Sequence, residues 1–141
     1  MNVLIDTNVV LDLLIRREPY YEDAARISIL SEKGFINSYL SASAITDIYY
    51  IASKELGNKD IVADMLEELL KTSHVAAVTE SNIHEALDLR WNDFEDSVQY
   101  SAGKSISAEY IITRNPKDYS ESQINVMSPE DFLKHIATIE R

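Results

Sequence analysis

Short apolar runs alternate along the chain with longer segments in which apolar residues recur at helical spacing. The first run, residues 3–5, is wholly apolar and ends at a polar triplet, as expected of a central strand buried on both faces of a parallel sheet. Similar runs predict further strands over 35–40, 75–78, 110–113 and 124–127. The other segments predict helices over 9–15, 20–33, 41–56, 60–71, 79–90, 95–105 and 129–139.

This alternation predicts βαβ units with right-handed crossovers. It therefore predicts an α/β fold, in which helices cover both faces of a parallel sheet of about five strands. The expected helix ends carry suitable residues: Gly34 and Gly57 follow helices, and Ser128 precedes Pro129 at the start of the last one. No repeat, low-complexity segment or linker divides the chain, so we expect a single domain over residues 1–141.

Hydrophobic residues make up 45 % of the chain, enough for a core, and cysteine is absent. The lack of cysteine excludes disulfides, thiolate zinc sites and cysteine nucleophiles. The N-terminus has no basic segment followed by a long apolar run, and no stretch approaches the roughly 18 apolar residues of a membrane helix. We therefore expect a cytoplasmic protein without a membrane association.

The net charge of −11 limits how the chain could bind nucleic acid. Such a surface repels phosphate on average, so binding of RNA would have to depend on cations and on basic residues close to the site. A charge of this size also keeps a small domain soluble and suits a basic protein partner.

Acidic residues stand where an α/β fold brings side chains to one edge of its sheet. Ligands of open α/β sheets bind beyond the carboxyl ends of the strands. Asp6 directly follows the first strand, Asp47 lies early in the helix after the second, and Asp96 begins the helix before the fourth. We expect these carboxylates to share a rim, with Asp47 partly surrounded by apolar residues. Each also has a structural interpretation, as a helix cap or as a partner of the helix dipole.

Further polar residues flank these three acids. Asp93 precedes Asp96 by three residues and is either the cap of the same helix or a support for the site. After the fourth strand come Thr113, Asn115 and Asp118. Asn115 precedes a proline and is a plausible cap for a short helical turn. Either Asn115 or Asp118 could complete the site, and the sequence leaves that choice open.

A site built from Asp6, Asp47 and Asp96 would need compensating charge. Two carboxylates 4 Å apart repel by about 4 kcal/mol at an effective dielectric near 20, so either protons or a cation must bind. Carboxylate ligands without His or Cys suit Mg²⁺ or Mn²⁺, which activate water and stabilise charge developing on a phosphoryl group. The basic residues expected near this rim, as candidates for contact with substrate phosphate, are Arg114, Lys117 and Lys104.

Four segments together resemble the motifs of the PIN-domain family, whose VapC-like members are ribonuclease toxins. In chain order they are VLIDTNV (3–9), SASAITD (41–47), DFEDSVQ (93–99) and IITRNPKDY (111–119). The resemblance covers nearly the whole chain. It implies a three-layer α/β/α fold, Mg²⁺- or Mn²⁺-dependent cleavage of RNA, a homodimer and inhibition by an antitoxin protein.

The resemblance also implies roles for individual residues. Asp6, Asp47 and Asp96 would be the metal ligands, and the supporting side chains would be those of Thr7, Asn8, Asp93, Thr113 and Asn115, with Asp118 as a further catalytic acid. Two positions depart from the family pattern. Asp47 stands where Glu is common, and Asn115 stands where an acid is frequent, with Asp118 three residues later.

Two other classes of α/β protein do not fit the sequence. A phosphoacceptor receiver domain would need an acid after the third strand and a lysine after the fifth, where Thr79 and Ser128 stand. A haloacid-dehalogenase-type phosphatase would need an acid at Asn8. The alternative that remains is a PIN-fold binding module without strong activity that acts through protein or RNA contacts, to which aromatic residues such as Tyr50 and Trp91 could contribute unless they lie in the core.

Overall fold

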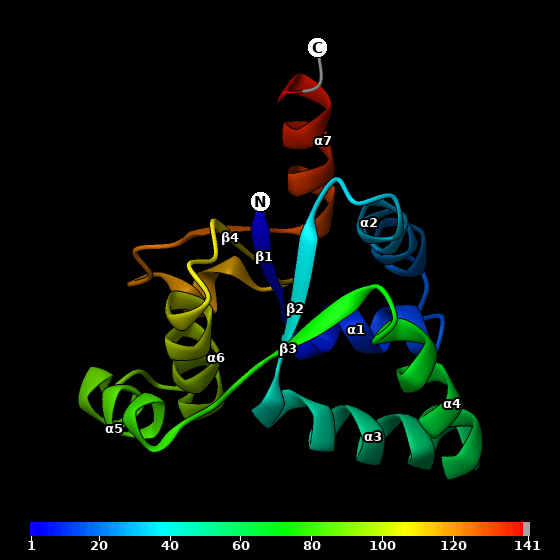
Figure 1. Ribbon diagram of the computed structural model, residues 1–141, viewed down its shortest axis with the longest axis horizontal. Coiled ribbons are helices and arrows are strands. Elements are labelled where there is room, and N and C mark those ends of the chain that lie inside the picture. Colours follow the sequence, from blue (N-terminus) through cyan, green and yellow to red (C-terminus); the bar gives the residue numbers. More distant parts are fainter. Residues whose placement is uncertain (140–141) are drawn as a thin grey trace.

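The computed structural model describes residues 1–139 and contains one five-stranded parallel sheet (Figure 1). The strand order is β3-β2-β1-β4-β5, so the first strand lies at the centre. The strands are β1 (Asn2–Ile5), β2 (Asn37–Ser41), β3 (Ser73–Ala76), β4 (Tyr110–Ile112) and β5 (Asn125–Met127). The predicted α/β class and the predicted parallel sheet are confirmed.

Helices follow or precede every strand, as the alternation predicted. They are α1 (Thr7–Leu14), α2 (Tyr21–Glu32), α3 (Ala42–Leu56), α4 (Lys59–Leu69), α5 (Glu80–Leu89), α6 (Phe94–Ser105) and α7 (Pro129–Ile139), with a short 3₁₀ helix η1 (Pro116–Tyr119) after β4. None of the helices within residues 1–139 combines the length and the apolar character needed to cross a bilayer.

The central strand separates two hydrophobic clusters because its side chains point alternately to the two faces of the sheet. Val3 and Ile5 pack into the larger cluster, to which α1, α2, α3 and α7 contribute. Leu4 packs into the smaller cluster, to which α6 contributes Tyr100 and Ala102. Figure 1 shows α5 and α6 on one side of the sheet and α1, α2 and α4 on the other. The three-layer α/β/α arrangement is thereby confirmed.

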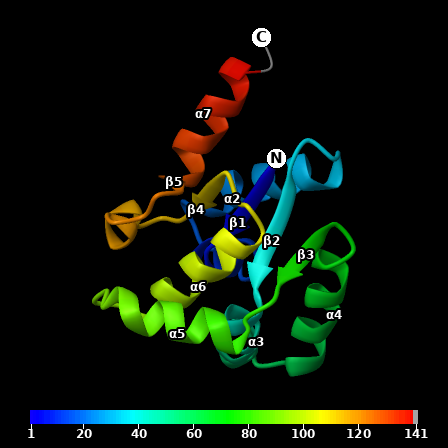
Figure 2. The same cartoon turned by 60° about the vertical axis from the view of Figure 1, so that its left-hand side comes forward.

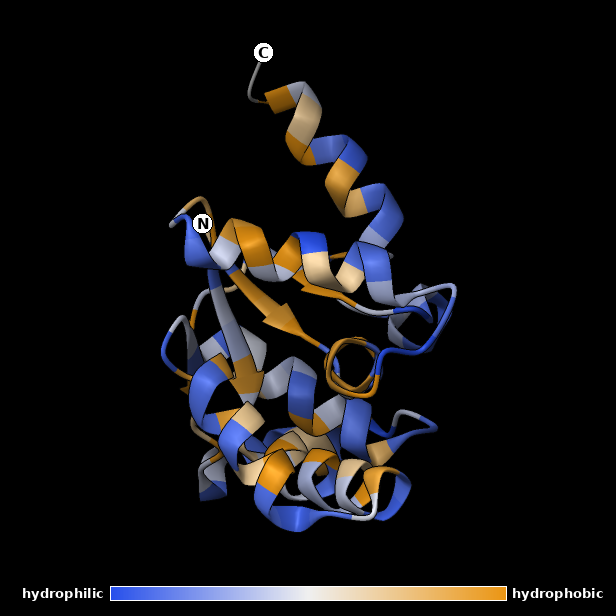
Figure 3. Ribbon diagram, turned by 90° about the vertical axis from the view of Figure 1, so that its right-hand side faces the viewer, coloured by the Kyte–Doolittle hydropathy of each residue, from blue (hydrophilic) through white to orange (hydrophobic). Residues whose placement is uncertain are grey.

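Apart from α1 and α6, which bury residues on all sides, the helices are amphipathic, since each buries one side against the sheet or against another helix. In Figure 3 their ribbons change repeatedly between hydrophobic and hydrophilic residues along their length. Figure 2 shows α6 lying across the sheet with α5 packed outside it. That outer contact is partly polar: the buried Asn82 amide donates to Ser101 Oγ and Ser105 Oγ, both at 2.9 Å. The packing of α5 on α6 is therefore stabilised by side-chain amides and hydroxyls as well as by apolar contacts.

Three elements begin two residues away from the predicted start, for physical reasons. The first helix begins at Thr7, two residues early, because Asp6 caps it. β3 begins at Ser73, two residues early, because Ser73 pairs its hydroxyl with Ser38 at 2.7 Å and so is buried despite being polar. β2 begins at Asn37, two residues late, because Phe35 stays 57 % exposed outside the sheet.

Candidate active site

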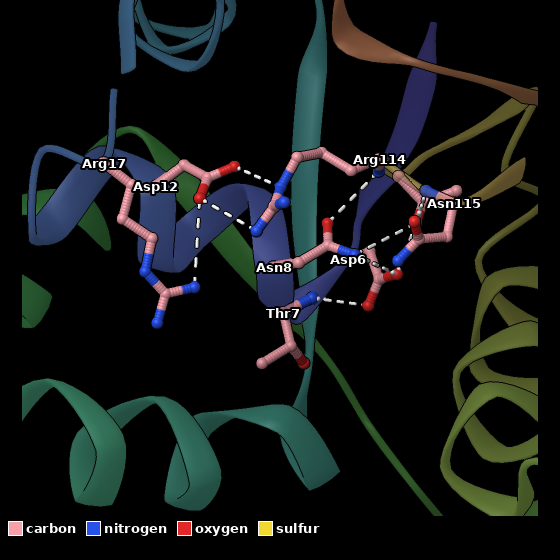
Figure 4. A network of polar contacts seen from close by, with 8 residues as sticks. Asp6, Thr7, Asn8, Asp12, Arg17, Arg114 and Asn115 are labelled. Carbon is pink, nitrogen blue, oxygen red and sulfur yellow. Dashed lines mark hydrogen bonds and ion pairs between the residues drawn. The ribbon is translucent and has the colours of Figure 1, made fainter. Parts of the chain in front are cut away.

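The carboxylate of Asp6 is the best-connected group at the carboxyl edge of the sheet. Its backbone N–H donates to Ile112 O at 2.9 Å, which fixes it between β1 and β4. Oδ1 accepts from the Thr7 N–H at 2.6 Å and from Gln99 Nε2 at 2.9 Å. Oδ2 accepts from Thr113 Oγ1 at 2.6 Å (Figure 4 shows the setting of Asp6). Asp6 is thus both the cap of α1 and a buried, fully oriented carboxylate, 6 % exposed.

Asp96 is joined to Asp6 through two intervening side chains. Gln99 Nε2 lies 3.3 Å from the Tyr119 hydroxyl, and that hydroxyl donates to Asp96 Oδ1 at 3.2 Å. Asp96, Gln99 and Tyr119 are all buried, and burial strongly raises the pKa of the Tyr119 hydroxyl. A phenol that stays protonated accepts here from Gln99 Nε2 and donates to Asp96. We refer to Asp6, Gln99, Tyr119 and Asp96 as the bridged carboxylate pair.

The pKa of Asp96 is raised from 3.8 to about 7, first by burial and then by the negative charges of Asp6 and Asp93. The hydrogen bond from Tyr119 acts in the opposite direction, and Asp118 adds a smaller repulsion. Asp96 therefore carries a proton for part of the time at neutral pH when no cation is bound. A carboxyl pKa raised in this way indicates that several negative charges lie close together.

Asp93 and Glu95 complete the acidic part of α6. Asp93 caps the helix, since its Oδ1 accepts from the Asp96 N–H at 3.1 Å, which confirms the capping interpretation. Glu95 Oε1 accepts from Thr7 Oγ1 at 3.3 Å. Burial and the charge of Asp47 raise the pKa of the Glu95 carboxyl. Glu95 is therefore a fourth acid of the site, and it was not among the residues predicted.

Asp47 is placed differently from the prediction. Its side chain on α3 is exposed, so the expectation that it is partly surrounded by apolar residues is wrong. The buried stripe of α3 runs through Ala44, Ile48 and Ala52, and Asp47 lies beside this stripe on the solvent side. Asp47 influences the site through its negative charge, which raises the pKa of Glu95. It does not join the bridged carboxylate pair.

The donor set can be tested for its fit to a hard cation. Within residues 1–139, no three Asp, Glu or His side chains stand in a ready-made metal-ligand arrangement, so the predicted trio of Asp6, Asp47 and Asp96 is not preformed. The chemistry of the donors nevertheless fits, because they are carboxylates together with an amide oxygen. Gln99 Oε1 is buried without a hydrogen-bond partner among the described residues. The same amide binds Asp6 through Nε2.

The segment after β4 supports Asp6 from the other side. The Thr113 hydroxyl binds Asp6 and also accepts from the Asn115 N–H at 3.1 Å. Asn8 Nδ2 lies 3.4 Å from Asp6 Oδ2, and Asn8 Oδ1 accepts from the Arg114 N–H at 3.3 Å (Figure 4). The predicted supporting positions Thr7, Asn8 and Thr113 therefore all lie at the site. Asn115 precedes η1 as expected, but its side chain makes no capping hydrogen bond.

The guanidinium of Arg114 is occupied by protein groups. Its Nε lies 2.7 Å from Asp12 Oδ2 and its Nη2 donates to Asp12 Oδ1 at 3.2 Å, while the ring of Tyr20 stacks on it with 4.1 Å between the guanidinium carbon and the ring centroid. Arg17 approaches the same carboxylate at 3.9 Å (Figure 4). Asp12 is 1 % exposed, and burial raises its pKa against the two arginines. Arg114 thus ties α1 to the segment after β4.

Lys104 does not lie near the site, so the expectation that it borders this rim is wrong. It stands at the far end of α6 from Asp96, where Nζ pairs with Glu85 Oε2 at 2.9 Å and lies over the ring of Tyr100. Lys117, by contrast, lies in η1 beside Asp118, with an exposed side chain. Of the predicted basic residues, Lys117 is therefore the one near the acids whose ammonium has no ion-pair partner within residues 1–139.

Replacing Arg114 with Met is expected to destabilise the protein by about 2–3 kcal/mol in urea unfolding, because it leaves the buried Asp12 carboxylate with only the distant Arg17. The matched control is Arg26→Met, since Arg26 pairs with Glu22 in an exposed position, and there we expect a change within about 0.5 kcal/mol. Equal effects of the two substitutions would contradict a structural role for Arg114.

Sequence patterns contained two further features that point to the missed residues. Gln99 lies three residues after Asp96 and hence on the same helical face, turned toward β1. Tyr119 ends the fourth motif and is buried at the end of η1. Neither residue is charged, so neither is recognised by a search for the residue types that usually ligate metals.

The fold and the site define a class: a three-layer α/β/α protein with bridged, buried carboxylates at the carboxyl edge of a parallel sheet. The sequence model of the PIN domain family matches residues 2–117, most of the chain. The chain therefore belongs to the PIN-domain family, as the motifs predicted. A search of the curated proteins found no match.

Several solved structures share this fold. One is a toxin-antitoxin complex from Klebsiella pneumoniae, with a TM-score of 0.68, 19 % identity, and coverage of 90 % of this chain and 97 % of that one. FitAcB from Neisseria gonorrhoeae gives a TM-score of 0.69 at 19 % identity over 91 % and 98 %. VapC20 from Mycobacterium tuberculosis, described as a toxin that cleaves the sarcin-ricin loop, gives 0.63 at 16 % over 77 % and 86 %.

Proposed function

We propose that this chain is a Mg²⁺- or Mn²⁺-dependent endoribonuclease and the toxin of a toxin-antitoxin pair. The observation that carries the proposal is the bridged carboxylate pair, in which Asp6 and Asp96 are buried together at the carboxyl edge of the sheet. Membership of the PIN-domain family supports it. So do the similar structures, which include toxin-antitoxin complexes and an RNA-cleaving toxin.

A divalent ion would be held by Asp6 and Asp96, with Asp47 as the predicted third ligand and Asp118 and Glu95 close by. When bound, the ion supplies a hydroxide nucleophile and stabilises negative charge on a phosphoryl group. The residues of the chain do the positioning. Thr113 and Gln99 fix the two oxygens of Asp6, at 2.6 and 2.9 Å. Tyr119 orients Asp96 in the same way.

Asp96 also has a role in the handling of protons. Its pKa of about 7 lets it lose a proton as a cation arrives and regain one when the cation leaves. Because Tyr119 stays protonated, it cannot take up that proton, and exchange has to occur with solvent through the acidic rim. Cation binding to this site should therefore be weaker at pH 6 than at pH 8.

The remaining parts of the proposal concern partners. RNA would be the substrate and an antitoxin protein the inhibitor, and the chain would act as a homodimer in the cytoplasm. An antitoxin partner is supported by the similar structures, which include a toxin-antitoxin complex as well as VapBC2 from Rickettsia felis and FitAB, each bound to DNA. A net charge of −11 favours a partner whose contact surface is basic.

The test is cleavage of a mixed-sequence single-stranded RNA by the purified chain, with Mg²⁺, with Mn²⁺ and with a chelator. Cleavage is expected with either ion and none with the chelator, since the carboxylates require a cation to accept phosphate. RNA that stays intact at excess Mn²⁺, with the protein folded by circular dichroism, would contradict the proposal.

A second candidate function is a PIN-fold binding module. It is favoured by one observation: the described residues include no preformed three-ligand group, and Asp47 is exposed. The two candidates differ in their dependence on metal. A binding module would hold RNA or protein equally well with Mn²⁺ and with a chelator, and would leave the RNA uncut.

A further inference from the structure

A hollow lies beside the bridged carboxylate pair and has no part in the proposed chemistry. It is an open hollow of about 190 Å³, lined by Arg90, Trp91, Asn92, Asp93, Lys117, Asp118, Ser120 and Glu121. We propose that this Trp91 pocket binds one nucleotide of the single-stranded RNA next to the scissile phosphate, with its base against Trp91 and its phosphate between Arg90 and Lys117. The inference rests on the proposed function and adds a subsite to it.

The pocket borders the acidic site. Asp93 and Asp118 both line it, and the charges of both act on the Asp96 carboxyl. Asp93 also caps α6 one turn before Asp96. A strand of RNA whose phosphate reaches Asp96 therefore has its neighbouring nucleotide at the mouth of the Trp91 pocket.

The two cations of the pocket are not committed elsewhere. Arg114, Lys104 and Arg17 pair with Asp12, Glu85 and Glu55, whereas Arg90 and Lys117 take part in no ion pair within residues 1–139. In a chain of net charge −11, two exposed cations beside an acidic site are a distinctive feature. Phosphate binding depends on such side chains.

Arg90 occupies an unusual backbone position. It ends α5 in the left-handed conformation with φ 57°, where Gly or Asn usually stands. A residue with a Cβ atom is strained there, as it is at Arg16 and Ser107, and strained residues are more frequent at functional sites. Arg90 is the one of the three that lines the Trp91 pocket.

Trp91 gives the pocket an aromatic wall. Its ring packs against Tyr100, with 4.8 Å between centroids, and edge-on against Tyr119 at 6.0 Å, while the residue stays half-buried. The ring is thus held rigidly by aromatic neighbours and still reaches the pocket. Proteins that bind single-stranded nucleic acid combine cations along the backbone with aromatic rings on which bases stack.

The test uses Trp91 itself, because it is the only tryptophan of the chain. In the cleavage-deficient Asp6→Asn protein, a short single-stranded RNA is titrated while tryptophan fluorescence and RNA anisotropy are both recorded. We expect saturable quenching that follows the anisotropy change. Adding Arg90→Ala and Lys117→Ala should weaken binding at least about tenfold and lower the salt slope of log K by about 1.4.

The matched control is Lys33→Ala with Lys59→Ala, which removes the same charge from exposed positions outside the pocket. It should leave affinity and quenching nearly unchanged. RNA binding without a fluorescence change, or equal weakening by both pairs, overturns the subsite. RNA cleavage is measured in parallel, with Asp6 intact. If the cleavage rate is unchanged by Arg90→Ala with Lys117→Ala, the subsite alone is overturned. If the protein neither binds nor cleaves RNA, both proposals are overturned.

Discussion

Replacing Asp6 with Asn is expected to lower metal-dependent RNA cleavage by roughly 100- to 1,000-fold or more. The substitution removes the charge at the centre of the bridged carboxylate pair. It also places an amide donor where the Thr7 N–H, Gln99 Nε2 and Thr113 Oγ1 all donate. One of these buried donors must then lose its acceptor, so both the cation and the orientation of the site are affected.

The matched control for that experiment is Asp64→Asn, an exposed acid on α4 outside the site. It removes the same charge, and its cleavage rate should stay within about twofold of the original, as expected of a surface substitution. An Asp6→Asn protein that is folded and keeps more than a tenth of the cleavage rate would contradict a central role for Asp6.

Replacing Asp96 with Asn should stabilise the metal-free protein at alkaline pH. The pKa of this carboxyl is about 7 in the folded protein against an ordinary 3.8, so the folded state binds more protons between these values. Stability of the original protein therefore falls as pH rises from about 4 to 7. At about 1.36 kcal/mol per pH unit, the loss approaches roughly 4 kcal/mol above pH 7, because Asp96 is only 9 % exposed.

The measurement is urea unfolding with a chelator at pH 4.5, 6 and 8. The Asn variant should exceed the original protein by only about 1 kcal/mol at pH 4.5 and by roughly 2–4 kcal/mol at pH 8, less what a weakened bond to Tyr119 removes. Mn²⁺ should then stabilise the original protein and not the variant. A difference that is the same at all three pH values would show that Asp96 is not held near neutrality by its neighbours.

Much of the fold was predictable from the sequence because it depends on local patterns. A wholly apolar run such as residues 3–5 can be satisfied only in a strand covered on both faces, which places it at the centre of a parallel sheet. Asp6 at its end follows the rule that functional groups gather beyond the carboxyl ends of such strands. The family motifs extended this to the positions of Asn8, Asp96 and Thr113, all of which lie at the site.

The errors arose where three-dimensional position departs from distance along the chain. Lys104 is only eight residues from Asp96, but a helix rises about 1.5 Å per residue, which separates them by roughly 12 Å along α6. Asp47 borders the buried stripe of α3, and helical spacing alone does not decide to which side a border residue turns. Gln99 and Tyr119 were missed because their importance lies in joining two carboxylates, which only the folded chain reveals.

The placement of Arg114 illustrates a general difficulty with charged residues beside an acidic site. Its position directly after Thr113 suggested contact with phosphate, yet its guanidinium is held by Asp12 and covered by Tyr20. In a strongly acidic chain, a basic residue has many possible partners, and a buried carboxylate competes well for it. Free cations are therefore better identified from the structure, where Arg90 and Lys117 are the two that border the site.

The most direct test of a cation held by the bridged carboxylate pair is Mn²⁺ titration calorimetry at pH 7 in two buffers of different ionisation enthalpy. We expect one ion to bind the original protein with release of about half a proton, since Asp96 with a pKa of about 7 must ionise. The Asp6→Asn/Asp96→Asn double variant should give no binding heat. Binding of Mn²⁺ by that variant as strongly as by the original protein, or no binding by either, would contradict the carboxylate site.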